Sequence, residues 1–320
     1  MQKVFYILSF LLLAVSNSSA QTIGNNLSEI VKVEAPSAKG FGYPYYLYVP
    51  KAMRENNNAK KKYTLLVIPN NSGKLSDDLS VQEDDAKRRI LNDGKWFDQL
   101  EVAVLIPVFP RSQTNWKIYT HALDRDVMTT DKKEFSRFDL QLIRMIDDAR
   151  TKLAKEKLKF DKRVFITGFS ASGMFANRFT FLHPKRVKAV AIGSPGGWAI
   201  APVASYNGKT LRYPIGVNDF KSVSGKKFDL KNLRKVPLFM FLGDKDENDS
   251  VPYRDGYEKE DEDLIFILFG KKLVERWKIS EQLYLNNKLN AEFRLYPNVK
   301  HEITNQMISD IKRFFSKYTE

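Results

Sequence analysis

The stretch KRVFITGFSASGMFANRF, residues 162–179, combines an apolar strand, a tight turn and the start of a helix. The turn, Gly-Phe-Ser-Ala-Ser-Gly at 168–173, places two serines between two glycines. Gly168 lets the backbone turn without a Cβ clash, and Gly173 lets the next helix pack close to the strand. A strand, a Gly-x-Ser turn and a helix in this order predict a nucleophile elbow with Ser170 at its apex. A purely structural corner is the alternative.

The two serines of the turn have different expected roles. At the apex, the Ser170 hydroxyl is expected to be exposed above the backbone N–H groups of the helix, which stabilise negative charge on a bound carbonyl. Ser172 falls in the first helical turn and faces inward, where it packs or caps. The usual Gly-x-Ser-x-Gly pattern therefore has serine at its fifth position here, with glycine one residue later.

Apolar runs alternate with amphipathic stretches along the chain, which predicts an α/β fold with a doubly wound, mostly parallel sheet. Strands are expected at residues 45–49, 63–68, 102–108, 163–167, 187–192, 237–242 and 291–296. Helices are expected at residues 80–92, 138–158, 172–182, 263–277, 281–290 and 303–318. Several strand segments are continuously apolar, as expected for strands that are buried on both faces.

Two long irregular segments, residues 111–135 and 195–235, interrupt this alternation. Each follows the carboxyl end of a strand, which is the edge where open α/β sheets bind ligands. We therefore expect lid-like insertions that border a site. No repeat or linker divides the chain, so residues 21–320 are expected to form a single domain.

The first 20 residues have the features of a secretory signal peptide. Lys3 supplies the positive charge, residues 4–15 are an apolar run, and Ser-Ser-Ala at 18–20 provides the small residues for cleavage near Ala20. The apolar run is too short for stable membrane insertion. Together with the absence of cysteine, this segment predicts a secreted or periplasmic bacterial protein.

The formal net charge is +14, which raises the question of an anionic partner. The lysines are dispersed in short groups, so nucleic acid binding is not expected, although attraction to anionic surfaces is compatible with the charge. The absence of cysteine excludes thiol nucleophiles, zinc sites with cysteine ligands and iron–sulfur clusters.

A serine nucleophile needs a general base, and the chain has three histidines. His183 lies at the far end of the helix that follows Ser170, immediately before Pro184, so a helix-terminal role is expected. His121 lies in the first irregular segment. His301 follows the last strand at the carboxyl edge of the sheet, and it is therefore the favoured base, with His121 a candidate for substrate binding.

The acid that orients this base is expected in the loop after the strand at 237–242. This loop carries four acidic residues, Asp244, Asp246, Glu247 and Asp249. The order serine, acid, histidine then places every member at the carboxyl end of a strand, which is typical of a Ser–acid–His triad. A solvated acidic loop or a weak calcium site is the alternative.

With these motifs, most of the chain after the leader resembles the α/β-hydrolase superfamily. The likeness depends on the turn at 168–173, on Gly-Asp-Lys-Asp at 243–246 before Val-Pro at 251–252, and on His301. Within the superfamily the chain is most similar to secreted bacterial esterases related to feruloyl esterases and polyhydroxybutyrate depolymerases. The resemblance implies an α/β-hydrolase fold and an esterase activity.

The resemblance also bears on the choice of acid. In the family's usual Gly-x-x-Asp-x-x-Val-Pro arrangement the acid follows glycine by three residues, which implies Asp246. Three extra residues precede Val251 here, so Asp249 stays an alternative.

The family forms its oxyanion hole after the first main strand, often with a His-Gly pair. This chain has Pro-Asn-Asn-Ser-Gly at 69–73 instead. The resemblance implies that the backbone N–H of Ala171 and that of Asn70 or Asn71 hold the oxyanion. A polar turn is an equal alternative.

Four residues of the first irregular segment are expected to line the substrate pocket: Arg111, Trp116, Tyr119 and His121. The rings suit an acyl, aromatic or sugar group, and the arginine suits a carboxylate. Packing of these side chains onto the core is the alternative.

The sequence therefore predicts a secreted serine hydrolase that cleaves esters of small molecules or polymers through an acyl-enzyme. The expected triad is Ser170, Asp246 and His301, and no metal or organic cofactor is expected. A serine peptidase of the same fold and a non-catalytic polymer-binding protein of this fold are the alternatives.

Overall fold

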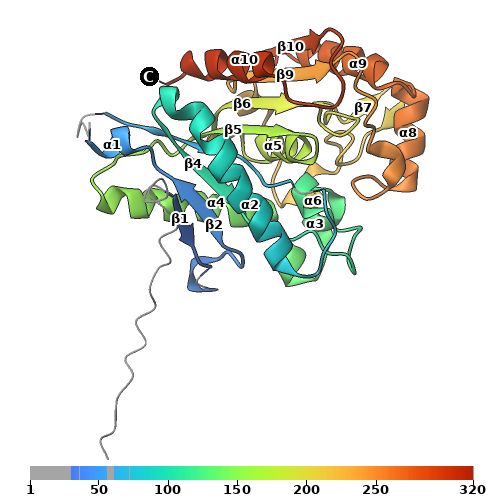
Figure 1. Cartoon of the computed structure of the whole chain (residues 1–320). Coiled ribbons are helices and arrows are strands. Elements are labelled where there is room, and N and C mark those ends of the chain that lie inside the picture. Colours follow the sequence, from blue (N-terminus) through green and yellow to red (C-terminus); the bar gives the residue numbers. More distant parts are fainter. Residues whose placement is uncertain (1–29, 36, 56–60, 72, 320) are drawn as a thin grey trace, which may run out of the picture.

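The computed structural model describes residues 30–35, 37–55, 61–71 and 73–319 (Figure 1). The expected signal peptide, residues 1–20, lies outside these ranges. Within them, none of the helices combines the length and the apolar character that crossing a membrane requires.

An eight-stranded mixed sheet forms the centre of the molecule, in the spatial order β1-β2-β4-β3-β5-β6-β9-β10. The six strands from β4 to β10 are parallel, whereas β2 is antiparallel to both of its neighbours. A separate antiparallel pair, β7 and β8, lies outside the sheet. The strands are β1 (Ile30–Val33), β2 (Tyr45–Tyr48), β3 (Thr64–Val67), β4 (Val102–Pro107), β5 (Val164–Phe169), β6 (Val187–Gly193), β7 (Ser205–Tyr206), β8 (Lys209–Thr210), β9 (Leu238–Gly243) and β10 (Ala291–Tyr296).

Helices cover both faces of this sheet (Figure 1). The core on one face includes side chains of α4, α5 and α9, and the core on the other face includes side chains of α2 and α10. The helices are α1 (Lys51–Glu55), α2 (Leu79–Asp93), α3 (Arg125–Thr129), α4 (Phe138–Lys155), α5 (Ala171–Leu182), α6 (Phe220–Ser224), α7 (Leu230–Leu233), α8 (Lys259–Phe269), α9 (Leu273–Asn286) and α10 (Asn305–Ser316).

The apolar runs form central strands because both faces of the sheet are covered. In β4, Ala103 and Leu105 enter one core while Val104 and Ile106 enter the other. All six residues of β4 are buried. Burial on both sides favours a continuous apolar sequence over an alternating one. The doubly wound, mostly parallel sheet predicted from the sequence is confirmed.

The predicted elements need correction in two places. The helices expected at 263–277 and 281–290 are both wrong, because α8 ends before Gly270, which has a φ of +88°, and α9 runs without a break from Leu273 to Asn286. A left-handed residue of this kind terminates a helix at little cost when it is glycine. The antiparallel edge strand β1 was not expected, since its four residues show no full apolar run.

The irregular segment 195–235 is a packed layer rather than an open loop. It contains the β7–β8 pair and the short helices α6 and α7. Trp198 is only 2% exposed and stacks on Phe269 of α8 with ring centroids 3.9 Å apart. Leu211 and Ile215 are fully buried in the same apolar cluster. The segment therefore forms a third core beside α5 and α8.

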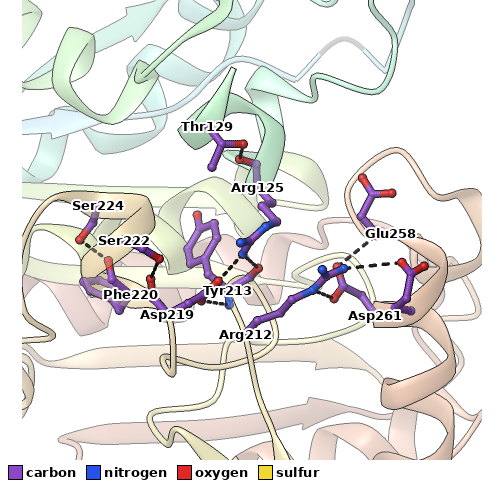
Figure 2. A network of polar contacts seen from close by, with 11 residues as sticks. Arg125, Thr129, Arg212, Tyr213, Asp219, Phe220, Ser222, Ser224, Glu258 and Asp261 are labelled. Carbon is purple, nitrogen blue, oxygen red and sulfur yellow. Dashed lines mark hydrogen bonds and ion pairs between the residues drawn. The ribbon is translucent and has the colours of Figure 1, made fainter. Parts of the chain in front are cut away.

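Polar contacts join this layer to its neighbours (Figure 2). Arg125 of α3 donates to the Tyr213 carbonyl at 3.0 Å and to the Asp219 carboxylate at 2.6 Å. The same carboxylate accepts the Tyr213 backbone N–H at 2.7 Å. On the other side, Arg212 donates to Asp261 of α8 at 2.7 Å. These bonds link the two irregular segments to each other and to α8.

Candidate active site

The sharp corner between β5 and α5 is built around Ser170. Its φ of 60° and ψ of −127° are rare for a residue with a Cβ atom. The Ser170 backbone N–H donates to the Gly193 carbonyl at 3.0 Å, and its carbonyl accepts from Met174 at 2.9 Å. Such a strained conformation persists only where the surrounding structure holds it, and it is most common at functional sites.

Two glycines make this corner sterically possible. A Cβ atom at Gly168 would lie 2.1 Å from the backbone oxygen of Ser172. A Cβ atom at Gly173 would lie 2.4 Å from the backbone oxygen of Gly193 in β6. Both distances are far inside van der Waals contact, so the turn and the close approach of α5 to the sheet depend on glycine.

The structure distinguishes the two serines of the turn. Ser172 is fully buried, and its hydroxyl accepts the Phe169 N–H at 3.0 Å and donates to the Phe169 carbonyl at 2.8 Å. Ser170 is partly exposed. Its hydroxyl has no hydrogen-bond partner among the described residues. Ser172 therefore stabilises the turn, and Ser170 presents a free hydroxyl.

Asp246 and His301 form a bonded pair at the carboxyl edge of the sheet. The imidazole Nδ1 lies 2.9 Å from Oδ2 and 3.1 Å from Oδ1 of the carboxylate, whose side chain is fully buried. Burial alone would raise the pKa of Asp246, but the hydrogen bonds from His301 and from the Asn248 backbone N–H hold it below its ordinary value. The carboxylate is thus ionised at neutral pH and accepts the Nδ1 proton.

The loops after β9 and β10 meet closely, which brings the pair together. A Cβ atom at Gly243 would lie 2.2 Å from the Val299 backbone oxygen, so only glycine allows the loop before His301 to pass there. The Lys245 N–H donates to the same Val299 oxygen at 2.9 Å.

The imidazole also packs on the elbow. The ring of Phe169, the residue before Ser170, lies with its centroid 4.7 Å from that of His301. This contact places the imidazole near the corner that carries Ser170. A neutral imidazole with its Nδ1 proton held by a carboxylate carries the lone pair on Nε2, the atom that abstracts a proton in serine hydrolysis.

Asp249, the alternative acid, has a different partner. Its carboxylate bonds Arg276 of α9 at 2.5 Å, and that arginine is 1% exposed. Its other oxygen accepts the Val251 N–H at 3.1 Å. Asp249 therefore neutralises a buried arginine, and it is Asp246 that contacts His301.

Asn248 was not predicted as a site residue from the sequence. Its backbone N–H donates to Asp246 Oδ1 at 2.9 Å, and its side-chain Nδ2 lies 3.0 Å from His301 Nε2. Asn248 thus contacts both members of the pair. Its position two residues after the acid gave no signal, because asparagine is common in polar loops.

The asparagines after β3 lie beside the corner but differ in role. The Asn70 side chain is fully buried and exchanges two hydrogen bonds with the Phe109 backbone, each of 3.1 Å. It therefore joins the loops after β3 and β4. The Asn71 side chain donates to the Phe169 carbonyl at 3.2 Å, next to the apex serine. Ala171 is the first residue of α5, at the helix end where N–H groups have no intrahelical acceptor.

Arg111 is turned inward rather than toward solvent. It is 4% exposed, donates to the Trp116 carbonyl at 2.6 Å and pairs with Asp255 at 2.8 Å. Its guanidinium also lies 3.6 Å from the centroid of the Tyr119 ring. Trp116 itself is 40% exposed. Of these residues, Trp116 presents the most surface, and Arg111 fastens its loop to the loop after β9.

His121 is fully buried. Its Nε2 lies 2.7 Å from the Phe109 carbonyl and 3.2 Å from the Asn70 amide. Burial, chiefly, lowers the pKa of His121 to about 3. The imidazole is therefore neutral, donates to the carbonyl and offers no surface to a ligand from solvent.

The third histidine lies at the other end of α5. His183 bonds Asp139 of α4 at 2.8 Å and lies 2.9 Å from the Lys226 ammonium. It is the C-cap residue of α5, at the opposite end of the helix from Ser170, and its side chain contacts α4 and the segment 195–235 rather than the end of its own helix.

Comparisons with known proteins concern the fold. No family model matches the chain, and no curated protein sequence matches it. Among solved structures, poly(aspartic acid) hydrolase-1 from Sphingomonas sp. KT-1 aligns with a TM-score of 0.57 and 16% identity over 91% of this chain and 98% of its own. A poly(3-hydroxybutyrate) depolymerase, LpqC from Bordetella parapertussis, aligns with a TM-score of 0.54 and 14% identity over 90% and 88%.

An esterase from Thermogutta terrifontis aligns with a TM-score of 0.51 and 10% identity over 91% and 93% of the two chains. At identities this low, the alignments show a shared architecture and nothing finer. The sheet order, the corner between β5 and α5 and these alignments agree, and the chain therefore has the α/β-hydrolase fold.

Proposed function

We propose that the chain is a serine hydrolase that cleaves carboxylic esters through an acyl-enzyme. The observation that carries this proposal is the bonded Asp246–His301 pair beside the strained, partly exposed Ser170. Groups of these three types in this relation are what an alcohol nucleophile needs at neutral pH.

Each residue has a defined role in the proposed reaction. Ser170 Oγ attacks the ester carbonyl while His301 Nε2 takes its proton, which gives a tetrahedral oxyanion. Collapse of this intermediate breaks the ester C–O bond, and the imidazolium returns the proton to the leaving alcohol. Water then repeats the two steps on the acyl-enzyme and releases the acid. Asp246 keeps the Nδ1 proton in place and stabilises the imidazolium throughout.

The oxyanion is proposed to bind between the loops after β3 and β5. The Ala171 N–H at the start of α5 supplies one donor, and the backbone N–H of Asn71 supplies the second. The Asn71 side chain supports this arrangement, since its bond to the Phe169 carbonyl holds its loop against the elbow. Asn70 supports it indirectly, through its two bonds to the Phe109 backbone.

Cellular export belongs to the same proposal. Residues 1–20 act as the signal peptide, and residues 21–320 form the exported enzyme. Amino-terminal sequencing of protein recovered from a bacterial periplasm or culture medium should begin at Gln21; recovery only of unprocessed cytoplasmic protein would contradict export.

The enzymatic test compares wild type with Ser170→Ala and Ser172→Ala on p-nitrophenyl esters of increasing acyl length. Wild type should release nitrophenol in a burst that equals one acyl group per enzyme. Ser170→Ala should lose the burst and turn over at least about 10³-fold more slowly. Ser172→Ala, the matched control, should keep the burst if it folds. Burst kinetics in the Ser170 variant would refute the assignment of the nucleophile.

A further inference from the structure

The reactive nitrogen of the base already has a partner in this structure. His301 Nδ1 faces the ionised Asp246 and therefore carries the ring proton, so the neutral ring has its lone pair on Nε2. The Asn248 amide nitrogen lies 3.0 Å from Nε2 and donates to that lone pair. Serine attack requires the same lone pair to accept the Ser170 proton.

The Ser170 hydroxyl lacks a hydrogen-bond partner among the described residues, which agrees with an occupied Nε2. One lone pair accepts one strong hydrogen bond, so the amide and the hydroxyl exclude each other. The loop after β9 holds the amide in place, because the Asn248 backbone N–H bonds Asp246 Oδ1 at 2.9 Å.

We propose that Asn248 competes with Ser170 for Nε2 of His301 and thereby lowers the reactivity of the resting enzyme, and that a bound ester displaces its side chain. This inference rests on the proposed function. Asn248 is exposed, so its side chain has room to rotate away while its backbone stays bonded to Asp246. In this proposal the backbone N–H of Asn248 holds Asp246 in place, and its side-chain amide competes for Nε2 of His301.

The test measures the second-order rate of reaction with a small fluorophosphonate, a probe too small to displace the amide by its own binding. Asn248→Ala frees Nε2 and keeps the backbone bond, so the rate should rise about fivefold, the factor for one neutral hydrogen bond. Asn248→Asp places a carboxylate beside the ring and favours the imidazolium. Its rate at pH 7 should fall on the order of tenfold and recover at higher pH.

Asn286→Asp provides the matched control, since it makes the same charge change at an exposed position of α9. It should react like wild type. Asn248→Ser, whose hydroxyl is too short to reach Nε2, replaces the alanine variant if that protein does not fold. An alanine or serine variant that reacts at the wild-type rate or more slowly would overturn the inference. Failure of wild type itself to react would instead refute the proposed hydrolase.

Discussion

The carboxylate of Asp246 and the imidazole of His301, 55 residues apart in the chain, lie 2.9 Å apart where the loops after β9 and β10 meet. The parallel pairing of β9 with β10 brings these two loops to the same edge of the sheet. Gly243 then allows the second loop to pass over the first. The bonded pair thus follows from strand pairing and from one glycine.

Substitution of the two candidate acids should separate activity from stability. Asp246→Asn removes the partner that fixes the imidazole tautomer, so ester turnover should fall on the order of 10³–10⁴-fold in a folded protein. Asp249→Asn leaves the buried Arg276 without its counter-charge and should lower the free energy of unfolding by about 3 kcal/mol. Steady-state kinetics and denaturant unfolding of both variants provide the measurement. Full activity in the Asp246 variant would transfer the acid role elsewhere.

Replacing the apex serine by glycine should stabilise the protein while removing activity. The conformation of Ser170 is strained for a residue with a Cβ atom, and glycine adopts it more easily. The free energy of unfolding of Ser170→Gly should exceed that of Ser170→Ala by about 1 kcal/mol. Urea unfolding of the two variants measures this difference; equal stabilities would mean that the corner stores no strain.

The elbow glycine should tolerate no side chain. In Gly168→Ala the new Cβ atom would meet the Ser172 backbone oxygen at 2.1 Å, so the corner must shift. We expect a loss of about 3 kcal/mol of stability and loss of most activity. Gly42→Ala is the control, because a Cβ atom at Gly42 would lie 3.8 Å from the Gln141 side chain, an ordinary van der Waals distance. Unfolding midpoints that change equally in both variants would contradict the steric account.

Acid should unfold the protein partly through His121. The burial that lowers its pKa to about 3 keeps it neutral in the folded state, whereas the unfolded chain takes up a proton near pH 6.5. Its contribution to stability is therefore complete above pH 6.5 and is lost as the pH falls toward 3, by up to ~1.4 kcal/mol per pH unit. His121→Gln should be less stable than wild type at pH 7.5, with the difference shrinking toward pH 4.5. Parallel stability curves for the two proteins would exclude this role.

The core strands could be predicted because strands that are buried on both faces have continuous apolar sequences. In β9, for example, all six residues are buried. The edge strand β1 has no continuous apolar run, because two of its four residues are exposed. The packed structure of segment 195–235 could not be predicted either. Its burial depends on distant partners, such as Phe269 for Trp198, and has no period of its own.

The site residues likewise divide into those that a local sequence pattern predicts and those that depend on distant partners. The corner around Ser170 is a local pattern, so it could be predicted from its flanking glycines. The choice between Asp246 and Asp249 could not be made from the sequence in this way, because both lie in one loop. They differ only in their partners, His301 for Asp246 and Arg276 for Asp249. His121 and Arg111 were predicted to line the substrate pocket because their side chains suit ligand binding. In the structure both side chains are buried inside the protein.

The most direct test of the account is mass spectrometry of the folded, full-length protein after reaction with a fluorophosphonate. In this reaction the Ser170 Oγ–phosphorus bond forms, fluoride leaves and His301 takes the serine proton. We predict one adduct per chain, mapped to Ser170, absent from Ser170→Ala and strongly reduced in His301→Ala. An unlabelled wild-type protein, or an adduct on any other residue, would contradict it.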